Sequence, residues 1–414
     1  MIHWFVCRPW LTGLLLGLPS AALAQTDRPY LMQTMPYPVY SYPEPANYNL
    51  KWGKLIARIE GNVQFEFNDN INLAKEGRIA DISIAPMVTV GFILPTSREN
   101  VLTFDVGFGY RWYLNTPSVS SLNLAPRSRL DYRIFMDDVQ INLHDNFTIH
   151  SDPLTQVYVK GQAAQPLKFR RFINTVGAIG EWRPWRQWGF LAGYDYTLDR
   201  SLSSEFLDLD YDSHTFMLGA YYMPSSRFTV GLNGSVSLIY FRNGVQNDGG
   251  NWNVGPFATW QVTQFISLDA SLSYTETFFG DSGLLPDRSN YQGLSFQLSA
   301  RHRMNSTTTQ TLRVGHSIGT GYGGNYTENW GIQYSLITRL TRGVSLNSML
   351  SYDHYRVSQK GGDYGDRYLV YLGTGLQLDR KWDMGLGYTF SWNESGLGYG
   401  YYQNRVVIDL HRKF

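Results

Sequence analysis

The sequence is poor in cysteine, in charge of either sign and in long hydrophobic runs. Its 414 residues contain one cysteine, Cys7, which excludes a disulfide framework. Lys and Arg number 35 against 34 Asp and Glu, a formal net charge of +1, and this balance excludes a dedicated nucleic-acid or polybasic membrane-surface protein. After residue 24 no run reaches 18 consecutive apolar residues, so a helical membrane protein is excluded as well.

Aromatic residues and glycine, in contrast, are abundant. Tyr 29, Phe 22 and Trp 12 make up 15% of the chain, Gly numbers 40, and 17% of residues are charged. Soluble proteins carry about 25% charged residues. The aromatic content excludes disorder, and the glycine content argues against an all-helical fold.

The first 24 residues have the three parts of a secretory signal. Arg8 supplies the positive start, residues 11–18 the apolar stretch, and Ala22-Leu23-Ala24 the cleavage site, which predicts Gln25 as the first mature residue. The apolar run breaks at Pro19 and is too short for an anchor helix. Cys7 precedes the apolar stretch and would be removed with the signal. The mature chain is therefore expected to have no cysteine and no thiol chemistry.

A tether is predicted for residues 25–51. Residues 28–49 carry five prolines and five tyrosines and show no periodic apolar face. Because Pro fixes φ and removes a backbone donor, this composition indicates an extended periplasmic linker. Binding to a periplasmic partner and folding back into a barrel lumen remain alternatives.

From residue 52 onward, apolar and polar residues alternate strictly. Clear cases are residues 102–112, 227–240, 266–274 and 382–392. This period of two is typical of β-strands with one apolar and one polar face. The runs last 10 to 15 residues, whereas strands of soluble sandwiches have about 5 to 6. Tilted strands that cross a bilayer need the greater length, and aromatic residues near both ends of the apolar face fit the two interfaces.

Eighteen alternating runs are predicted, at 54–67, 79–93, 101–114, 128–136, 139–150, 170–182, 187–198, 213–223, 226–241, 252–262, 265–278, 291–303, 309–318, 328–339, 343–356, 366–379, 382–392 and 402–413. A turn at Asp137-Asp138 divides the segment 128–150 and keeps the count even. Tight turns alternate with long polar loops, which predicts short periplasmic turns and longer extracellular loops. We therefore expect an all-β, up-and-down antiparallel transmembrane β-barrel over residues 52–414.

The alternation also predicts which charged side chains face the lumen, since charge on the lipid face costs about 2 to 4 kcal/mol near the midplane. The predicted set is Arg58, Glu60, Asp105, Arg111, Asp131, Arg133, Asp195, Arg227, Asp269, Arg301, Arg303, Arg313, Arg339, Asp379, Asp383, Arg405 and Asp409. A barrel of about 18 strands is wide enough for an aqueous channel. Four of these arginines, at 301, 303, 313 and 339, fall on three adjacent strands and would favour anions, unless they only meet solvent at the rim.

Residues 406–414 alternate and end in Phe414. This ending resembles the C-terminal signature of bacterial outer-membrane proteins, and the resemblance implies that Phe414 is read by the barrel-assembly machinery. The residues Leu130-Asp131-Tyr132-Arg133-Ile134-Phe135, together with 139–147 and 171–175, are similar to the β-barrel porin 2 family. The resemblance implies an outer-membrane porin, on a motif that spans about residues 128–182.

Enzymatic and metal sites have little support. Asp353-His354, with Asp208, Asp210, Asp212 and His214, shares only residue types with outer-membrane proteases. His316 and Ser317 have opposite parity, which argues against a hydrolase pair. The acidic stretches 205–212 and 361–366 lack the spacing of a calcium loop. We expect no enzyme, no cofactor and no metal.

The sequence favours an outer-membrane porin, a water-filled channel for passive diffusion of small hydrophilic solutes. The alternative is an export or scaffold barrel, for example in polysaccharide secretion, that works with periplasmic partners. The bilayer is the expected partner in either case, and a homo-oligomer is compatible with the sequence. A barrel hydrolase is a third hypothesis.

Overall fold

A computed structural model describes residues 49–125, 128–150, 158–159, 162–163, 170–321 and 323–414. The predicted signal peptide and nearly all of the predicted tether lie outside these residues. No helix in the described part of the chain has the length and apolar character to cross a membrane.

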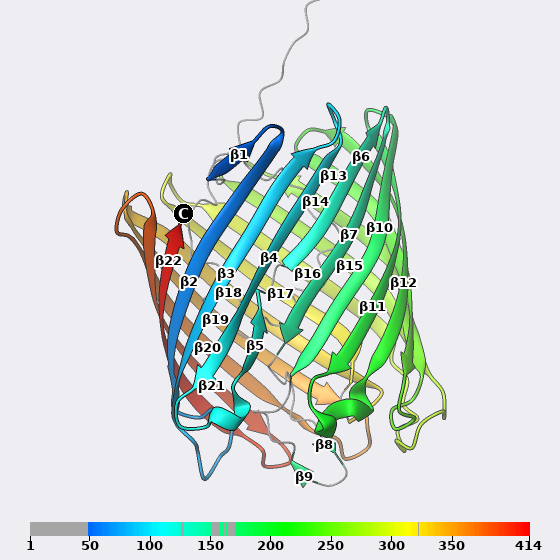
Figure 1. The fold of residues 1–414 in the computed structure, drawn as a ribbon. Coiled ribbons are helices and arrows are strands. Elements are labelled where there is room, and N and C mark those ends of the chain that lie inside the picture. The colour runs from blue at the N-terminus through cyan, green and yellow to red at the C-terminus, as the bar shows by residue number, and fades with distance from the viewer. Residues whose placement is uncertain (1–48, 126–127, 151–157, 160–161, 164–169, 322) are drawn as a thin grey trace, which may run out of the picture.

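The described chain is almost entirely β-structure (Figure 1). The strands are β1 (Leu50–Trp52), β2 (Leu55–Asn68), β3 (Asp81–Pro95), β4 (Val101–Tyr113), β5 (Ser121–Leu124), β6 (Ser128–Met136), β7 (Val139–His150), β8 (Tyr158–Val159), β9 (Gln162–Ala163), β10 (Arg171–Trp185), β11 (Trp188–Ser201), β12 (Tyr211–Ser225), β13 (Phe228–Phe241), β14 (Gly249–Gln261), β15 (Ile266–Phe279), β16 (Gln292–Arg303), β17 (Thr308–Thr320), β18 (Tyr326–Thr341), β19 (Val344–Val357), β20 (Tyr364–Gln377), β21 (Trp382–Ser395) and β22 (Tyr401–Lys413). Two short 3-10 helices are η3 (Pro117–Val119) and η5 (Ser204–Leu209).

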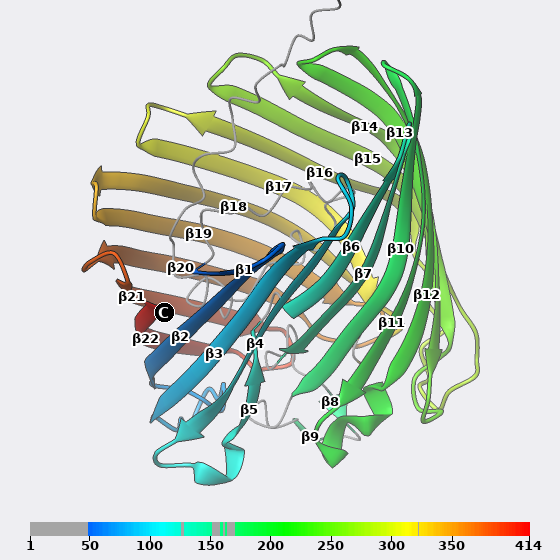
Figure 2. The same cartoon turned by 45° about the horizontal axis from the view of Figure 1, so that its top comes forward.

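Twenty of these strands belong to one antiparallel sheet that closes on itself. Closure comes from the pairing of β2 with β22, which runs from Glu60 opposite Lys413 to Asn68 opposite Arg405. Two members are short: β1 extends the edge of β2, and β5 continues the line of β6 beside β4. The other eighteen form the wall of the barrel, and Figure 2 shows how their ribbons curve around to close it.

The eighteen predicted segments are confirmed, with boundaries that differ by a few residues. The predicted segments 128–136 and 139–150 coincide with β6 and β7. The turn between them is Asp137-Asp138, and Asp137 has a φ of 49°. Asp tolerates this left-handed conformation better than most residues do, so the two strands can reverse in two residues.

The barrel is apolar on its outer face and polar on its inner face. Residues of one parity are large, apolar and exposed, such as Phe216 at 51% and Leu218 at 69%. Residues of the other parity are polar and buried, such as Asp409 at 0% and Gln333 at 2%. A soluble β-protein would have the opposite arrangement, so this pattern fits a wall with hydrocarbon outside and polar groups inside.

The connections have different lengths at the two ends. Tight turns join β6 to β7, β10 to β11, β12 to β13 and β18 to β19, and they lie at the end that carries β1 and the C-terminus (Figure 1). Longer connections, including η3 and η5, lie at the opposite end. We refer to these as the turn end and the loop end.

Candidate channel lumen

Most of the predicted lumen residues lie on wall strands with the inward parity. Two do not. Arg227 was predicted to lie within a strand, but it is exposed in the two-residue turn between β12 and β13, because the last pair of that hairpin is Ser225 and Phe228. Asp379 lies in the turn between β20 and β21. There the backbone N–H groups of Lys381 and Trp382 hold the pKa of the Asp379 carboxyl below its usual value.

The wall formed by β2, β3 and β4 carries arginines that are already neutralised. Arg58 on β2 forms ion pairs with Glu60, at 3.6 Å between Nη1 and Oε2, and with Asp105 on β4. The pair with Asp105 passes over Gly91 of the intervening β3: Gly91 is in register with both residues, and a Cβ there would meet the Asp105 carboxylate at 3.3 Å. The absence of a side chain at Gly91 therefore leaves room for a cross-strand ion pair.

Arg111 is the centre of a second neutralised cluster on this wall. Its Nη1 donates to Glu66 Oε2 at 3.1 Å and to Ser83 Oγ at 2.9 Å, and its Nη2 donates to Gln64 Oε1 at 2.6 Å. The Arg111 and Glu66 side chains are only 9% and 6% exposed. A buried guanidinium that is paired and hydrogen-bonded in this way has little charge left for a solute, and removal of one partner alone would leave a buried charge uncompensated.

The neighbouring strands continue this pattern. Arg129 Nε lies 3.1 Å from Asp131 Oδ2 on β6. His144 on β7 lies 3.0 Å, through Nε2, from Asp195 Oδ1 on β11, across Gly177 of β10. Arg133, also predicted for the lumen, is 5% exposed on β6.

At the seam where β22 meets β2, inward side chains form another network. His411 Nε2 lies 3.2 Å from Glu60 Oε2, and Lys413 Nζ lies 3.3 Å from Asp383 Oδ2. Asp409 is 0% exposed and accepts a hydrogen bond from Asn62. Arg405 has the same inward parity and lies nearer to the loop end of β22.

The wall formed by β16, β17 and β18 differs. It carries Arg301, Arg303, Arg313 and Arg339, as predicted, on three strands that are adjacent in the sheet. Within the described residues, no carboxylate lies within ion-pair distance of these four guanidinium groups. Arg303 donates to the backbone oxygen of Gln264 at 3.1 Å. Arg313 is opposite Ser299 and Gln333 in the two ladders, and Asp269, the nearest acidic position across β16, is opposite Ser299. This basic patch thus keeps its net charge.

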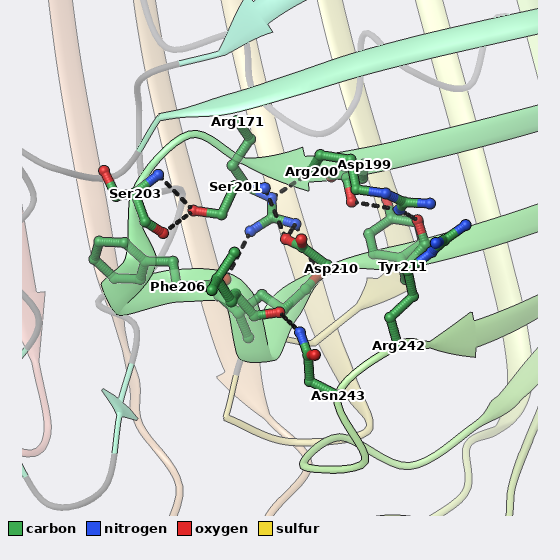
Figure 3. Close-up of polar contacts among 12 residues, drawn as sticks. Arg171, Asp199, Arg200, Ser201, Ser203, Phe206, Asp210, Tyr211, Arg242 and Asn243 are labelled. Atoms are coloured by element: carbon green, nitrogen blue, oxygen red, sulfur yellow. Dashed lines mark hydrogen bonds and ion pairs between the residues drawn. The ribbon is translucent and has the colours of Figure 1, made fainter.

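At the loop end, η5 is pinned to the barrel by one arginine (Figure 3). Arg171 is 0% exposed; its Nε donates to Asp199 Oδ1 at 2.5 Å, and its Nη2 donates to the Leu209 oxygen at 2.8 Å and lies 3.2 Å from Asp210 Oδ1. Phe206 of η5 is 1% exposed. Since Arg171 has the inward parity of β10, this pin holds η5 at the loop-end mouth of the lumen.

Four loops at the loop end are joined by a second set of polar residues, which we call the loop clasp: Asn247, Asp287 and Asn325, which are buried, and Ser358, which is half-buried. Asn247 Nδ2 donates to Asn325 Oδ1 at 3.0 Å and to the Asp287 oxygen at 2.8 Å. Asp287 Oδ2 accepts from the Asn325 N–H at 2.8 Å and from the Ser358 hydroxyl at 2.5 Å. Burial alone would raise the pKa of Asp287, but these donors outweigh it and hold the pKa below its usual value.

The residues weighed for catalysis do not form a common site. Asp353 accepts a hydrogen bond from Ser351 on the inner face, whereas the adjacent His354 contacts Asp366, at 3.0 Å between Nδ1 and Oδ1, on the outer face. Asp210 is engaged by Arg171, and Asp212 by Arg200 and Arg242. His316 is on the outer face, where it lies 2.9 Å from Glu328.

Sequence reasoning missed both polar assemblies of the loop end. Asp199 and Asp210 flank η5, and an inward Arg171 on the adjacent strand could have suggested a pin. The clasp residues Asn247, Asp287 and Asn325 are separated by long stretches of chain and sit in loops without periodicity, so no local pattern identifies them. Loop 151–169 is long enough in the sequence to fold inward as a constriction, and it lies outside the described residues apart from β8 and β9.

Comparison with solved structures supports the fold. The chain is similar to OpdK of Pseudomonas aeruginosa, solved with vanillate, at a TM-score of 0.50 and 11% identity, over 86% of this chain and 99% of that one. It is similar in the same way to OccK2 (OpdF) of Pseudomonas aeruginosa, at a TM-score of 0.50 and 10% identity, over 86% of this chain and 98% of that one. No family model and no curated protein matches the chain. The fold is a closed antiparallel β-barrel of eighteen strands.

Proposed function

We propose that the protein is an outer-membrane porin, a channel through which small hydrophilic solutes diffuse passively. The observation that carries the proposal is the closed eighteen-strand wall with an apolar outer face and a charged inner face. Its structural neighbour OpdK is an outer membrane protein that was solved with vanillate. That likeness supports the location, and the character of the solute follows from the lumen of this chain.

The wall residues divide the work of the channel. The neutralised clusters around Arg58 and Arg111 hold the wall and offer hydrogen bonds that replace part of a solute's hydration shell. The basic patch, in which Arg301 and Arg313 repel each other across adjacent strands, draws anionic groups toward one side of the lumen. The η5 segment, held by Arg171, narrows the loop-end mouth. We therefore expect small anions to pass more readily than small cations.

Single-channel recording of the refolded protein in a planar bilayer tests this proposal. A porin gives stable open steps, and a salt gradient gives a reversal potential with the sign of anion preference. The double variant R301Q/R313Q should keep the steps and move the reversal potential toward zero, whereas R288Q, which removes an arginine from an exposed loop ion pair, should leave it unchanged. A folded barrel without conductance would refute the porin.

An export or scaffold barrel is the second candidate, and one observation favours it. The hairpin of β1 and β2 projects at the turn end, and Trp52 on it is 85% exposed. The tether leads directly into this hairpin, so both could dock a periplasmic partner. Deletion of residues 28–49 separates the two functions: a porin still conducts, and an export barrel loses its partner.

The remaining predictions belong to the same proposal. We propose that residues 1–24 direct export, that residues 128–182 relate the chain to the β-barrel porin 2 family, and that Phe414 is the assembly signal. In support of the last, Phe414 follows β22 directly and is 53% exposed, with the Arg412 guanidinium 5.0 Å from its ring centroid. A terminal Phe414→Ala substitution should reduce the yield of assembled barrel in the membrane.

A further inference from the structure

The outer face of β11, β12 and β13 carries a charged group where a lipid-facing wall should have none. Asp212 and His214 share the outward parity of β12 with Phe216 and Leu218, which are 51% and 69% exposed. Arg200 on β11 has the parity of the outward Tyr194, and Arg242 follows the outward Tyr240 of β13 by two residues. Arg200 on β11, Asp212 on β12 and Arg242 just after β13 therefore lie together on the outside of the barrel. Figure 3 shows Arg200 and Arg242.

The position of this group along the strand fits the edge of the hydrocarbon region. At the turn end of the same face, Tyr222 of β12 lies against Trp188 of β11, with ring centroids 4.9 Å apart, and marks one membrane interface. Ten residues separate Tyr222 from Asp212. At about 3.4 Å per residue and a tilt of about 40°, they span roughly 26 Å across the membrane, close to the apolar band of about 25 Å of such barrels. Asp212 thus lies at the level of the lipid headgroups on the loop side.

Asp212 fixes two guanidinium groups in place. Its Oδ1 accepts hydrogen bonds from Arg200 and, at 2.7 Å, from the Tyr196 hydroxyl, and its Oδ2 accepts from Arg242 Nε at 2.7 Å. The hydrogen bonds of Arg200 are made within the protein, because its Nη1 also donates to the backbone oxygens of Asp199 and Tyr211, at 2.9 and 2.5 Å. One carboxylate therefore holds two cations, and the cluster has a net charge of +1.

Arg242 has donors to spare. Its side chain is 56% exposed, and its Nε donates to Asp212 Oδ2 at 2.7 Å. Asp212 anchors the guanidinium through this one nitrogen, and the two terminal Nη groups carry the remaining N–H donors. An anchored and exposed guanidinium matches the geometry of a phosphate, which it binds by paired hydrogen bonds.

Beside the charged cluster lies a group of rings that we call the aromatic floor: Tyr194, Tyr196, His214 and Tyr240. The Tyr194 hydroxyl lies 2.8 Å from His214 Nδ1, and the His214 ring lies 5.2 Å from Tyr196 and 6.0 Å from Tyr240, centroid to centroid. Tyr240 is 48% exposed on the outer face. Flat rings with polar edges suit the interfacial layer and give sugar rings a surface to pack on.

We infer that the outward cluster of Arg200, Asp212 and Arg242 is a headgroup site for a phosphorylated glycolipid of the outer leaflet, with Arg242 on the phosphate and the aromatic floor beneath the sugar. The inference rests on the membrane location in the proposed function and adds a lipid ligand to it. It does not depend on what crosses the lumen.

The test is native mass spectrometry of the full barrel in detergent with diphosphoryl lipid A, dephosphorylated lipid A and phosphatidylglycerol as probes. Diphosphoryl lipid A should bind in preference to the other two. R242Q should weaken its binding by roughly tenfold, and R242K by less, because Lys keeps the charge but loses the paired hydrogen bonds. R242Q is expected to fold, because Asp212 keeps Arg200 and Tyr196 as donors. The matched control is R288Q, an exposed arginine of the loop end that pairs with Asp281.

Each outcome decides the inference. Equal binding of diphosphoryl lipid A by R242Q and the parent protein overturns it, and so does an equal loss in R288Q. Displacement of the lipid by millimolar inorganic phosphate would assign the cluster to free anions and overturn the lipid site. Conductance of R242Q in a bilayer of phospholipids alone should match the parent protein. Loss of lipid binding with full conductance supports the site, whereas a non-conducting parent protein that still binds lipid A contradicts the porin and leaves the site standing.

Discussion

The two walls of the lumen use arginine in different ways. On β2 to β4, Arg58 and Arg111 lie within ion-pair distance of Glu60, Asp105 and Glu66. On β16 to β18, four arginines have no carboxylate in reach within the described chain. Side-chain ion pairs cross-link the first wall within the lumen, whereas at the basic wall the hydrogen bonds of the loop clasp join the loops at the loop end. Under the proposed function, the first wall contributes its paired charges to the structure of the barrel and the basic wall offers its charge to solutes.

Removal of Arg111 should have the largest effect on this comparison. R111A leaves the Glu66 carboxylate, 6% exposed, without its partner, and breaking a buried pair in this way costs about 3 to 5 kcal/mol. Thermal unfolding in detergent should show a much lower transition than for the parent protein. The matched variant on the basic wall, R313A, should cost less than about 1 kcal/mol, and equal losses for both variants would contradict the distinction between the walls.

The loop clasp should show the next largest effect, and it should depend on pH. The folded pKa of Asp287 is below its ordinary value of 3.8. Its contribution to stability is therefore complete above that ordinary value and is lost as the pH falls toward and through the folded value. D287N should lose about 1 to 3 kcal/mol at neutral pH and should have a flatter stability profile between pH 5 and pH 2 than the parent. Parallel profiles would show that Asp287 is not the titrating group.

Ion selectivity should respond to the basic wall and not to the paired wall. R301Q/R313Q removes two unpaired charges, and we expect the ratio of anion to cation permeability to fall by roughly twofold to fourfold, as for a weak, solvent-screened field. The measurement is the reversal potential in a salt gradient. The paired-wall variant R58Q/D105N, which removes a cation and an anion together, should leave the ratio close to that of the parent, and a larger shift there than on the basic wall would reverse the assignment.

The smallest effect is expected when both members of a buried pair are replaced together. R111M/E66M removes the charge and its partner, and replacement of buried ion pairs by apolar residues of similar size is often near neutral. Its unfolding transition should lie within about 1 kcal/mol of the parent, far above that of R111A. A double variant as unstable as R111A would mean that the bonds of Arg111 to Ser83 and Gln64, rather than charge compensation, hold this wall.

Much of the architecture was accessible to sequence reasoning because a barrel strand leaves a local signal. The alternation at 226–241 or 382–392 reports which face meets lipid, and the turn at Asp137-Asp138 reports where a strand reverses. Arg227 was misplaced because alternation continues through a two-residue turn, so the pattern does not show which residue forms the last pair. Likewise, the residues next to Asn247 in the sequence do not show that it contacts Asp287 and Asn325.

The sequence by itself determined the class of fold, the number of strands and the parity of the lumen residues, since each follows from a period of two and from turn residues that act over a few positions. Tertiary structure alone decided which charges are neutralised. Arg58 meets Asp105 across an intervening strand at Gly91, Arg171 meets Asp210 across a folded loop, and Arg242 reaches Asp212 on the outside of the barrel. Ion pairs form between charged groups that are close in space, and the register of the eighteen strands sets those distances.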